Sequence, residues 1–124
     1  MQEMKLHPAT DSFTRDLLHI QKDEPGVGNG SHHYEVYAES KNGASFNVLS
    51  LQFQHGPRME VGVNGVVTGT LLQILIDHLQ GFQSGEYRNR ETACAITHLE
   101  EALFWLKSRE LEREQRGVLG KAAK

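Results

Sequence analysis

The sequence predicts an α+β protein in which a small antiparallel β-sheet packs with a following antiparallel two-helix hairpin. Hydrophobic and polar residues alternate through the middle of the chain, and from Thr68 onward hydrophobic residues recur every three or four positions. A length of 124 residues is typical of one domain. We divide it into a partly irregular arm (residues 1–30) and a main domain (31–120), with the sheet at about 31–66 and the hairpin at about 68–116.

The arm is polar and ends in a run of residues that interrupt regular structure, Asp23-Glu24-Pro25-Gly26-Val27-Gly28-Asn29-Gly30. Four hydrophobic side chains before that run are expected to anchor part of the arm as a strand or a helical turn: Phe13, Leu17, Leu18 and Ile20. The first nineteen residues lack the long apolar run after a basic cluster that marks a secretion signal.

Alternating hydrophobicity predicts two antiparallel strands, one around residues 34–38 and one around 46–53. Lys41-Asn42-Gly43 supplies the turn between them. After His55-Gly56-Pro57 we expect a third short strand around Met59 to Val63, followed by a turn at Asn64-Gly65.

The first predicted helix has a broad apolar face, formed by Leu71, Leu72, Ile74, Leu75, Ile76, Leu79 and Phe82. Thr68 or Thr70 is expected to cap its start, and Gly81 or Gly85 to end it. One partner helix cannot cover so wide a face, which indicates a subunit interface as well as a core.

The second predicted helix opens near Arg90-Glu91, where the carboxylate is favourably placed in the first turn. Its apolar residues are spaced by three and four: Ala93, Ile96, Leu99, Leu103 and Leu106. The connection between the two helices is short, so we expect them to lie antiparallel.

Composition limits the classes of partner. The hydrophobic fraction is 38% and the formal net charge is −3, without the basic excess of general DNA- and RNA-binding proteins. No apolar stretch is long enough to cross a bilayer. The single cysteine, Cys94, allows no intrachain disulfide, favours a reducing cytoplasm and is expected to be a small buried hydrophobe.

The carboxyl-terminal third carries a candidate anion site. Arg109 and Arg113 are four residues apart and project from one face of the second helix, where Arg116 can join them. Phe82 or Tyr87 offers a surface on which a base can stack.

Two further side chains complete the candidate set. Thr92 can make a polar contact at the rim, and Arg90 carries a guanidinium at the other end of the second helix. Two arginines and one stacked base supply roughly 5–9 kcal/mol, whereas nanomolar binding requires about 12 kcal/mol. The simplest remedy is a pocket closed by a second copy of the chain.

An alternative for the arginines remains open. Glu110, Glu112 and Glu114 interleave with them, and a solvated, salt-bridged helix end has the same pattern. Phe82 on an apolar helix face is equally compatible with the core.

Catalysis is not indicated. The seven histidines lack the spacing of a zinc site, so we expect no metal and no cofactor. A nucleophile motif is also missing, since Cys94 falls inside a helical pattern. Two alternatives to a non-enzymatic binder stay open: a phosphodiesterase, and a regulatory protein-interaction module.

An ordered succession of motifs resembles the phage-encoded Thoeris anti-defence sponge family, which shares its helical hairpin with a class of anti-CBASS sponges. The resemblance covers roughly residues 31 to 120. It rests on Phe53-Gln54-His55-Gly56-Pro57, Glu60-Val61-Gly62-Val63-Asn64-Gly65, Gly81-Phe82-Gln83-Ser84-Gly85, Arg90-Glu91, Leu99-Glu100-Glu101-Ala102-Leu103, Trp105-Leu106, and Arg113 with Arg116-Gly117-Val118.

The resemblance implies a protein of the host bacterial cytoplasm that sequesters nucleotide immune signals without cleaving them. These signals are the glycocyclic ADP-ribose of Thoeris and, for some members, the cyclic di- and trinucleotides of CBASS. Members form dimers that assemble to hexamers, with pockets at subunit boundaries.

Matched position by position, the resemblance makes Phe82 the aromatic that stacks on the base and Arg109 and Arg113 the arginines that contact phosphate. Thr92 stands where asparagine is usual, which shortens that polar contact. The turn Glu86-Tyr87-Arg88-Asn89 also departs from the commoner Pro-Phe-Ala-Cys, and this difference bears on ligand choice more than on fold.

Overall fold

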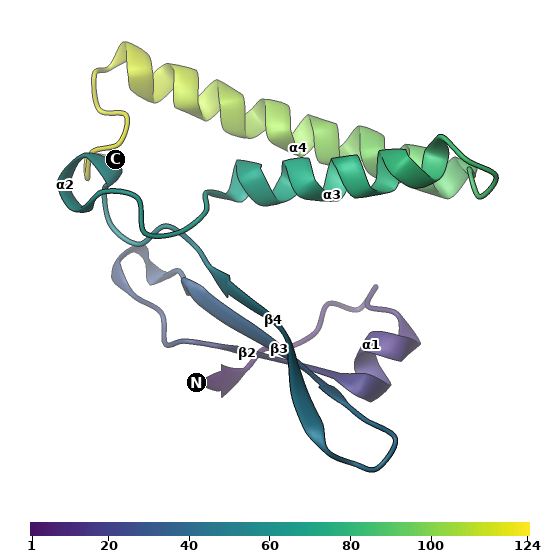
Figure 1. The fold of residues 1–124 in the computed structure, drawn as a ribbon. Helices are drawn as coiled ribbons and strands as arrows, with labels where there is room; N and C mark the ends of the chain where they lie inside the picture. Colours follow the sequence, from purple (N-terminus) through teal and green to yellow (C-terminus); the bar gives the residue numbers. More distant parts are fainter. The chain divides into compact units, whose positions relative to one another are not determined.

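The computed structural model describes residues 1–124, except for the side chain of Val27. Two compact units are present, Met1–His55 and Gly56–Lys124. The elements in chain order are β1 (Gln2–Glu3), α1 (Ser12–Leu17), β2 (Leu18–Lys22), the 3-10 turn η1 (Val27–Asn29), β3 (His33–Glu39), β4 (Ser45–Gln52), α2 (Arg58–Val61), α3 (Thr68–Gln83) and α4 (Arg90–Gln115) (Figure 1). An antiparallel sheet followed by helices confirms the predicted α+β class.

The first unit is built on a four-stranded antiparallel sheet with the order β1-β2-β3-β4. The two predicted strands are confirmed as β3 and β4, and they are joined by a turn in which Gly43 has a φ of 82°. The sheet takes its other two strands, β1 and β2, from the arm. The helical turn α1 is capped by Asp11, whose side chain accepts a hydrogen bond from the Thr14 N–H at 2.7 Å.

A β-bulge decides which side chains share the apolar face of the sheet. The register between β3 and β4 shifts at Val36/Tyr37, so that Val36 pairs with Leu49 but Ala38 pairs with Phe46. Cross-strand partners project to the same face, and a bulge reverses the alternation beyond it. Phe46 therefore joins Leu49 on the apolar face, although strict alternation along the sequence puts these two side chains on opposite faces.

The other face of the sheet carries a polar network centred on Glu35. Its carboxylate accepts hydrogen bonds from the Tyr37 hydroxyl, from His33 Nε2 at 3.1 Å and from the Ser50 hydroxyl at 3.4 Å. His33 Nδ1 lies 3.0 Å from Gln52 Oε1. The Tyr37 and His33 bonds lower the pKa of Glu35, and the bond to Glu35 raises the pKa of His33. This network ties β3 to β4.

The second unit begins differently from the prediction. The expected third strand around Met59 to Val63 is wrong, because this segment forms the single helical turn α2. Pro57 fixes the backbone before the turn, and its carbonyl accepts from the N–H groups of Glu60 and Val61. Gly62, at a φ of 76°, then ends the turn. Four residues are too few for periodicity to separate a strand from a helical turn.

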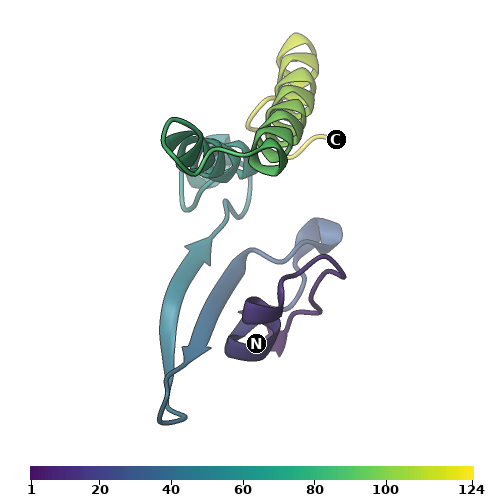
Figure 2. The same cartoon turned by 90° about the vertical axis from the view of Figure 1, so that its right-hand side faces the viewer.

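The helical hairpin is confirmed as α3 and α4, which lie side by side in Figures 1 and 2. Ile76 and Ile96, each 9% exposed, are the most buried side chains among those described. The predicted caps of α3 differ from the structure: α3 starts at Thr68 after Val67, which provides no side-chain cap, and ends at Gln83. Thr68 is therefore the first helical residue and not the N-cap, and the helix continues past Gly81 to Gln83, with Ser84 as the C-cap directly before Gly85.

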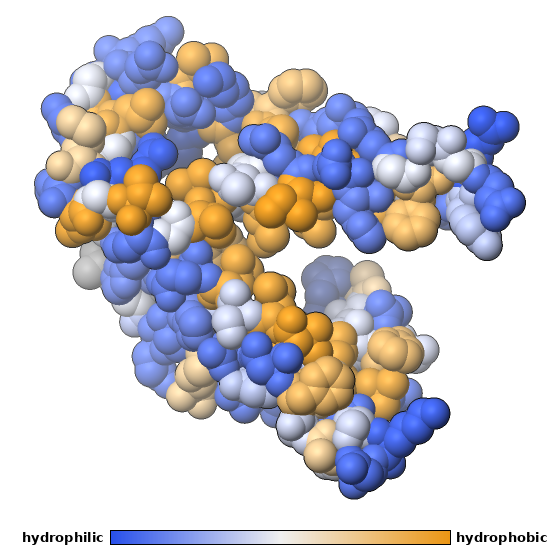
Figure 3. All heavy atoms as spheres, in the orientation of Figure 1, coloured by the Kyte–Doolittle hydropathy of each residue, from blue (hydrophilic) through white to orange (hydrophobic). Residues whose placement is uncertain are grey.

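Both units leave hydrophobic side chains exposed, and Figure 3 shows such side chains at the surface. Trp105 is 76% exposed and Phe104 is 69% exposed, so neither belongs to the core of the chain. Leu75 and Leu106 are partly exposed at 41% and 38%. A single chain thus leaves much of its hairpin uncovered, which is typical of proteins that assemble.

His19 connects the edge strand β1 to the rest of the sheet. Its Nδ1 lies 3.1 Å from Glu3 Oε1, and its Nε2 lies 3.2 Å from Glu39 Oε1. The hydrogen bond to Glu3, and after it the one to Glu39, raises the pKa of His19. A group whose pKa is raised by folding stabilises the fold fully below its unfolded pKa, and this contribution is lost as pH rises through the folded pKa.

We predict that His19→Gln destabilises the first unit more at about pH 5.5 than at pH 8, because the charged imidazole is replaced only at the lower pH. Urea unfolding followed by circular dichroism measures the loss of unfolding free energy at each pH, and amide exchange of β1 and β2 shows whether the loss falls on these strands. An equal effect of the substitution at both pH values contradicts the proposed role.

Candidate functional site

Four of the six predicted site residues lie at the turn end of the hairpin. Phe82 is in the last turn of α3, Tyr87 is in the connection, and Arg90 and Thr92 are in the first turn of α4. The connection between the helices, residues 84–89, is called here the hairpin turn.

Two aromatic rings are accessible at this end. Phe82 is 51% exposed, and its ring meets His78 edge-on at a centroid distance of 5.2 Å. Tyr87 is 71% exposed. The core alternative for Phe82 therefore does not hold within one chain, and the ring is available for stacking.

Asn89, which the sequence analysis did not single out, organises the start of α4. Its side-chain Oδ1 accepts a hydrogen bond from the Thr92 N–H at 2.7 Å and so caps the helix. Its Nδ2 donates to the Tyr87 carbonyl at 3.1 Å. An asparagine directly before the first helical residue is a recognised N-cap signal, which the helix boundary near Arg90 made available.

The other two predicted residues, Arg109 and Arg113, lie near the far end of α4. Arg109 is exposed, and its guanidinium makes no hydrogen bond or ion pair with any part of the chain that the structure describes. From Arg90 to Arg109 the helix advances 19 residues (109 − 90), or about 28 Å. One protomer therefore does not bring Phe82 together with the arginines.

Arg113 organises the segment that follows α4. Its Nη1 donates to the Ala123 carbonyl at 2.6 Å, and its Nη2 donates to the carbonyls of Val118 at 3.1 Å and Lys121 at 3.0 Å. Three of the five N–H groups of this guanidinium thus bond to residues 117–124. Arg116 pairs with Glu112, so the salt-bridged alternative describes Arg116 correctly but not Arg109.

Helix periodicity places the aromatic and the arginines on one side of the hairpin. Each residue turns the helix by roughly 100°. On α3, the Phe82 side chain is rotated about 120° around the helix axis from the buried Ile76. On α4, Arg109 and Arg113 are rotated about 140° and 100° from the buried Ile96, in the same direction of rotation as on α3. Equal rotations on two antiparallel helices that face each other point to the same side. Phe82, Arg109 and Arg113 therefore lie on one face of the hairpin, with Phe82 at the turn end and the two arginines at the other end.

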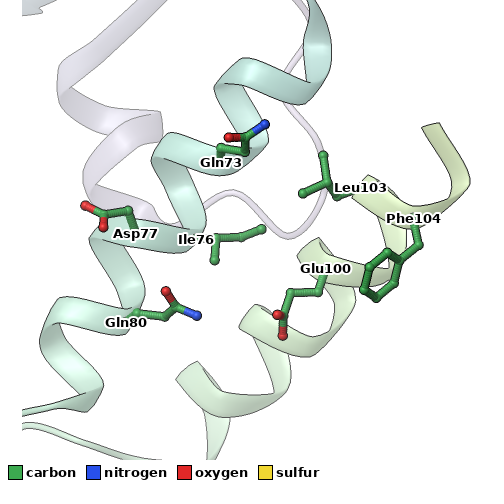
Figure 4. Close-up of a pocket in the computed structure, with 7 residues that line it drawn as sticks. All are labelled: Gln73, Ile76, Asp77, Gln80, Glu100, Leu103 and Phe104. Carbon is green, nitrogen blue, oxygen red and sulfur yellow. The ribbon is translucent and has the colours of Figure 1, made fainter. Parts of the chain in front are cut away.

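A groove of about 350 Å³ runs along the opposite side of the hairpin. Figure 4 shows its lining from both helices: Gln73, Ile76, Asp77, Gln80, Glu100, Leu103 and Phe104. None of the six predicted site residues lines it. The carboxylates of Asp77 and Glu100 repel phosphate, so this groove does not suit an anionic ligand.

The remaining reactive side chains include the histidines and the single cysteine, and among them the His78 ring lies beside Phe82. Among residues 1–124 as described, no group of three or more metal-ligating side chains is placed to hold a metal ion. His32, directly before β3, stacks on His55 with a centroid distance of 4.1 Å. Cys94 is exposed, which corrects the expected buried position, because the side of α4 that carries it faces away from α3.

No helix in the described part of the chain combines the length and hydrophobicity that a membrane span requires.

Comparison with known proteins assigns the class. Residues 50–109 match the family model of the Acb2/Tad1 hairpin domain, which covers α3 and most of α4. The chain is also 37% identical over 140 aligned positions to Thoeris anti-defense 1 of Bacillus phage SBSphiJ7, and the alignment covers 97% of both proteins. The chain therefore belongs to the Acb2/Tad1 hairpin family, as the resemblance implied.

We predict that Asn89→Ala destabilises the protein by about 1 kcal/mol, because the Thr92 N–H loses its cap. Chemical denaturation followed by circular dichroism measures this change. Asn89→Asp is the matched control, since it retains the accepting oxygen, and equal destabilisation by the two substitutions contradicts the capping role.

Proposed function

We propose that this protein is a phage anti-defence protein that binds and sequesters a nucleotide immune signal in the host bacterial cytoplasm. The proposed ligand is glycocyclic ADP-ribose of Thoeris, with the cyclic di- and trinucleotides of CBASS as a second ligand class. The family membership and the name of the phage relative support the anti-defence role.

The single observation that carries the ligand proposal is the shared face of Phe82, Arg109 and Arg113. An exposed ring offers a stacking surface for a base, and guanidinium groups bind phosphate in a forked geometry. Arg109 has no partner among the described residues, so a phosphate can bind it without displacing a protein contact. The two N–H groups that Arg113 does not use for residues 117–124 can add to that contact.

A homo-oligomer resolves the separation of these groups along the hairpin. In a two-fold symmetric dimer each contact occurs twice, so the turn end of one hairpin can lie against the arginine end of its partner. Partly exposed leucines, Leu75 and Leu106, lie on the shared face between the two ends. Their burial supplies an apolar contact for such a dimer, and each dimer then contains two pockets, each with Phe82 from one protomer and Arg109 from its partner.

Complementation between subunits tests the shared pocket. Phe82→Ala and Arg109→Ala should each weaken binding of glycocyclic ADP-ribose roughly 10- to 100-fold, since a charge-assisted hydrogen bond or a stacked base contributes about 1–3 kcal/mol. A mixed dimer of the two variants retains one intact pocket, so titration calorimetry should recover wild-type affinity at half the wild-type stoichiometry.

Lys107→Ala is the matched control, because it removes a nearby positive charge that pairs with Glu110 on another side of α4. Failure of the mixed dimer to bind, when both parent variants fold, contradicts a pocket built from two protomers.

Sequestration differs from cleavage in what the protein releases. We predict that heating the loaded protein returns the nucleotide unchanged, because sequestration leaves the covalent bonds of the ligand intact. Chromatography with mass spectrometry of the released material identifies it. Recovery of an opened or hydrolysed product instead supports the phosphodiesterase alternative.

A further inference from the structure

The hairpin turn is closed by a side-chain amide that makes two hydrogen bonds to the backbone of one residue, as a paired strand residue does. Gln83 is the last residue of α3 and is half-buried. Its Nε2 donates to the Asn89 carbonyl at 2.9 Å, and its Oε1 accepts from the Asn89 N–H at 2.9 Å. Both backbone groups of Asn89 are thus bonded by one side-chain amide, which fixes the position of the chain as it enters α4.

This amide pair is linked by hydrogen bonds to residues of the proposed pocket. Asn89 holds the Thr92 N–H through Oδ1 and the Tyr87 carbonyl through Nδ2. Gln83 also directly follows Phe82 in the sequence. The stacking ring on α3 and the first turn of α4 are therefore held in one arrangement by the contact between Gln83 and Asn89.

Apart from this contact, the hydrogen bonds of the hairpin turn join residues that are close in sequence: the Ser84 and Gly85 N–H groups donate to the Gln80 and Phe82 carbonyls, and Asn89 Nδ2 donates to the Tyr87 carbonyl. Within the turn, the Ser84 hydroxyl bonds back to the Gly81 carbonyl on α3, and the Tyr87 ring is largely exposed. A loop that samples many conformations must be ordered when a ligand binds, and that ordering lowers affinity.

We propose that Gln83 is a positioning residue for nucleotide binding. It does not contact the ligand but holds the mouth of the pocket, formed by Phe82, Tyr87 and Thr92, in the binding-competent arrangement. This inference rests on the proposed function.

The test compares Gln83→Ala with Gln80→Ala. Gln80 is the same residue type one turn earlier on α3 and lies on the groove side of the hairpin. We expect Gln83→Ala to bind glycocyclic ADP-ribose roughly tenfold more weakly in calorimetry, and Gln80→Ala to bind like the wild type.

Two further measurements separate positioning from a general loss of structure. If Gln83 only selects the competent arrangement, Gln83→Ala should lower the association rate in stopped-flow experiments, because a smaller fraction of molecules can bind. Amide exchange should accelerate at Asn89, whereas exchange around Ile76 and Ile96 should stay at the wild-type rate.

Unchanged affinity of Gln83→Ala in a wild-type background that binds overturns the inference and leaves the proposed function intact. A loss carried only by faster dissociation, or an unchanged exchange rate at Asn89, also overturns it. A wild-type protein that binds no nucleotide instead refutes the proposed function itself, while the exchange rate at Asn89 still reports on the Gln83 contact.

Discussion

The antiparallel packing of α3 against α4 is the constraint on which the rest of the second unit depends. It buries Ile76 and Ile96, and the close approach of the helices is seen at Gly69, where an added Cβ would lie 3.4 Å from the Leu103 side chain. This pairing fixes which side chains share each side of the hairpin. One side carries a groove with carboxylates, and the other carries an aromatic ring and arginines separated by leucines.

The separation of Phe82 from Arg109 gives the proposed function its dependence on assembly. A helix about 28 Å long between the two ends cannot fold back on itself, so a ligand that needs both groups requires a second hairpin. In the proposed dimer, binding and oligomerisation use the same face, and burial of Leu75 and Leu106 would stabilise the pocket that the arginines complete. The same coupling makes affinity sensitive to protein concentration.

Polar contacts set the local geometry around that face. Gln83 and Asn89 hold the turn end, and Arg113 holds residues 117–124 at the other end. In each case one side chain bonds backbone groups at the end of a helix or in the segment beside it. In the first unit, side-chain hydrogen bonds of His19 and of the Glu35 network join neighbouring strands, and they raise the pKa of His19 and His33 and lower the pKa of Glu35.

The sequence by itself determined the α+β class, the two central strands, the helical hairpin and the family, because periodicity over eight or more residues and ordered motifs are properties of the chain. It did not determine the helical turn at Arg58–Val61, because four residues are too few to show a period. It did not determine the sheet face of Phe46 either, because a bulge interrupts the alternation of side chains in the strand. Only the tertiary structure decided that the Arg109 guanidinium has no partner among the described residues while Arg113 bonds the following segment, and that Gln83 meets Asn89. Those contacts join residues whose mutual distance depends on how the chain turns, and spacing along the sequence does not encode it.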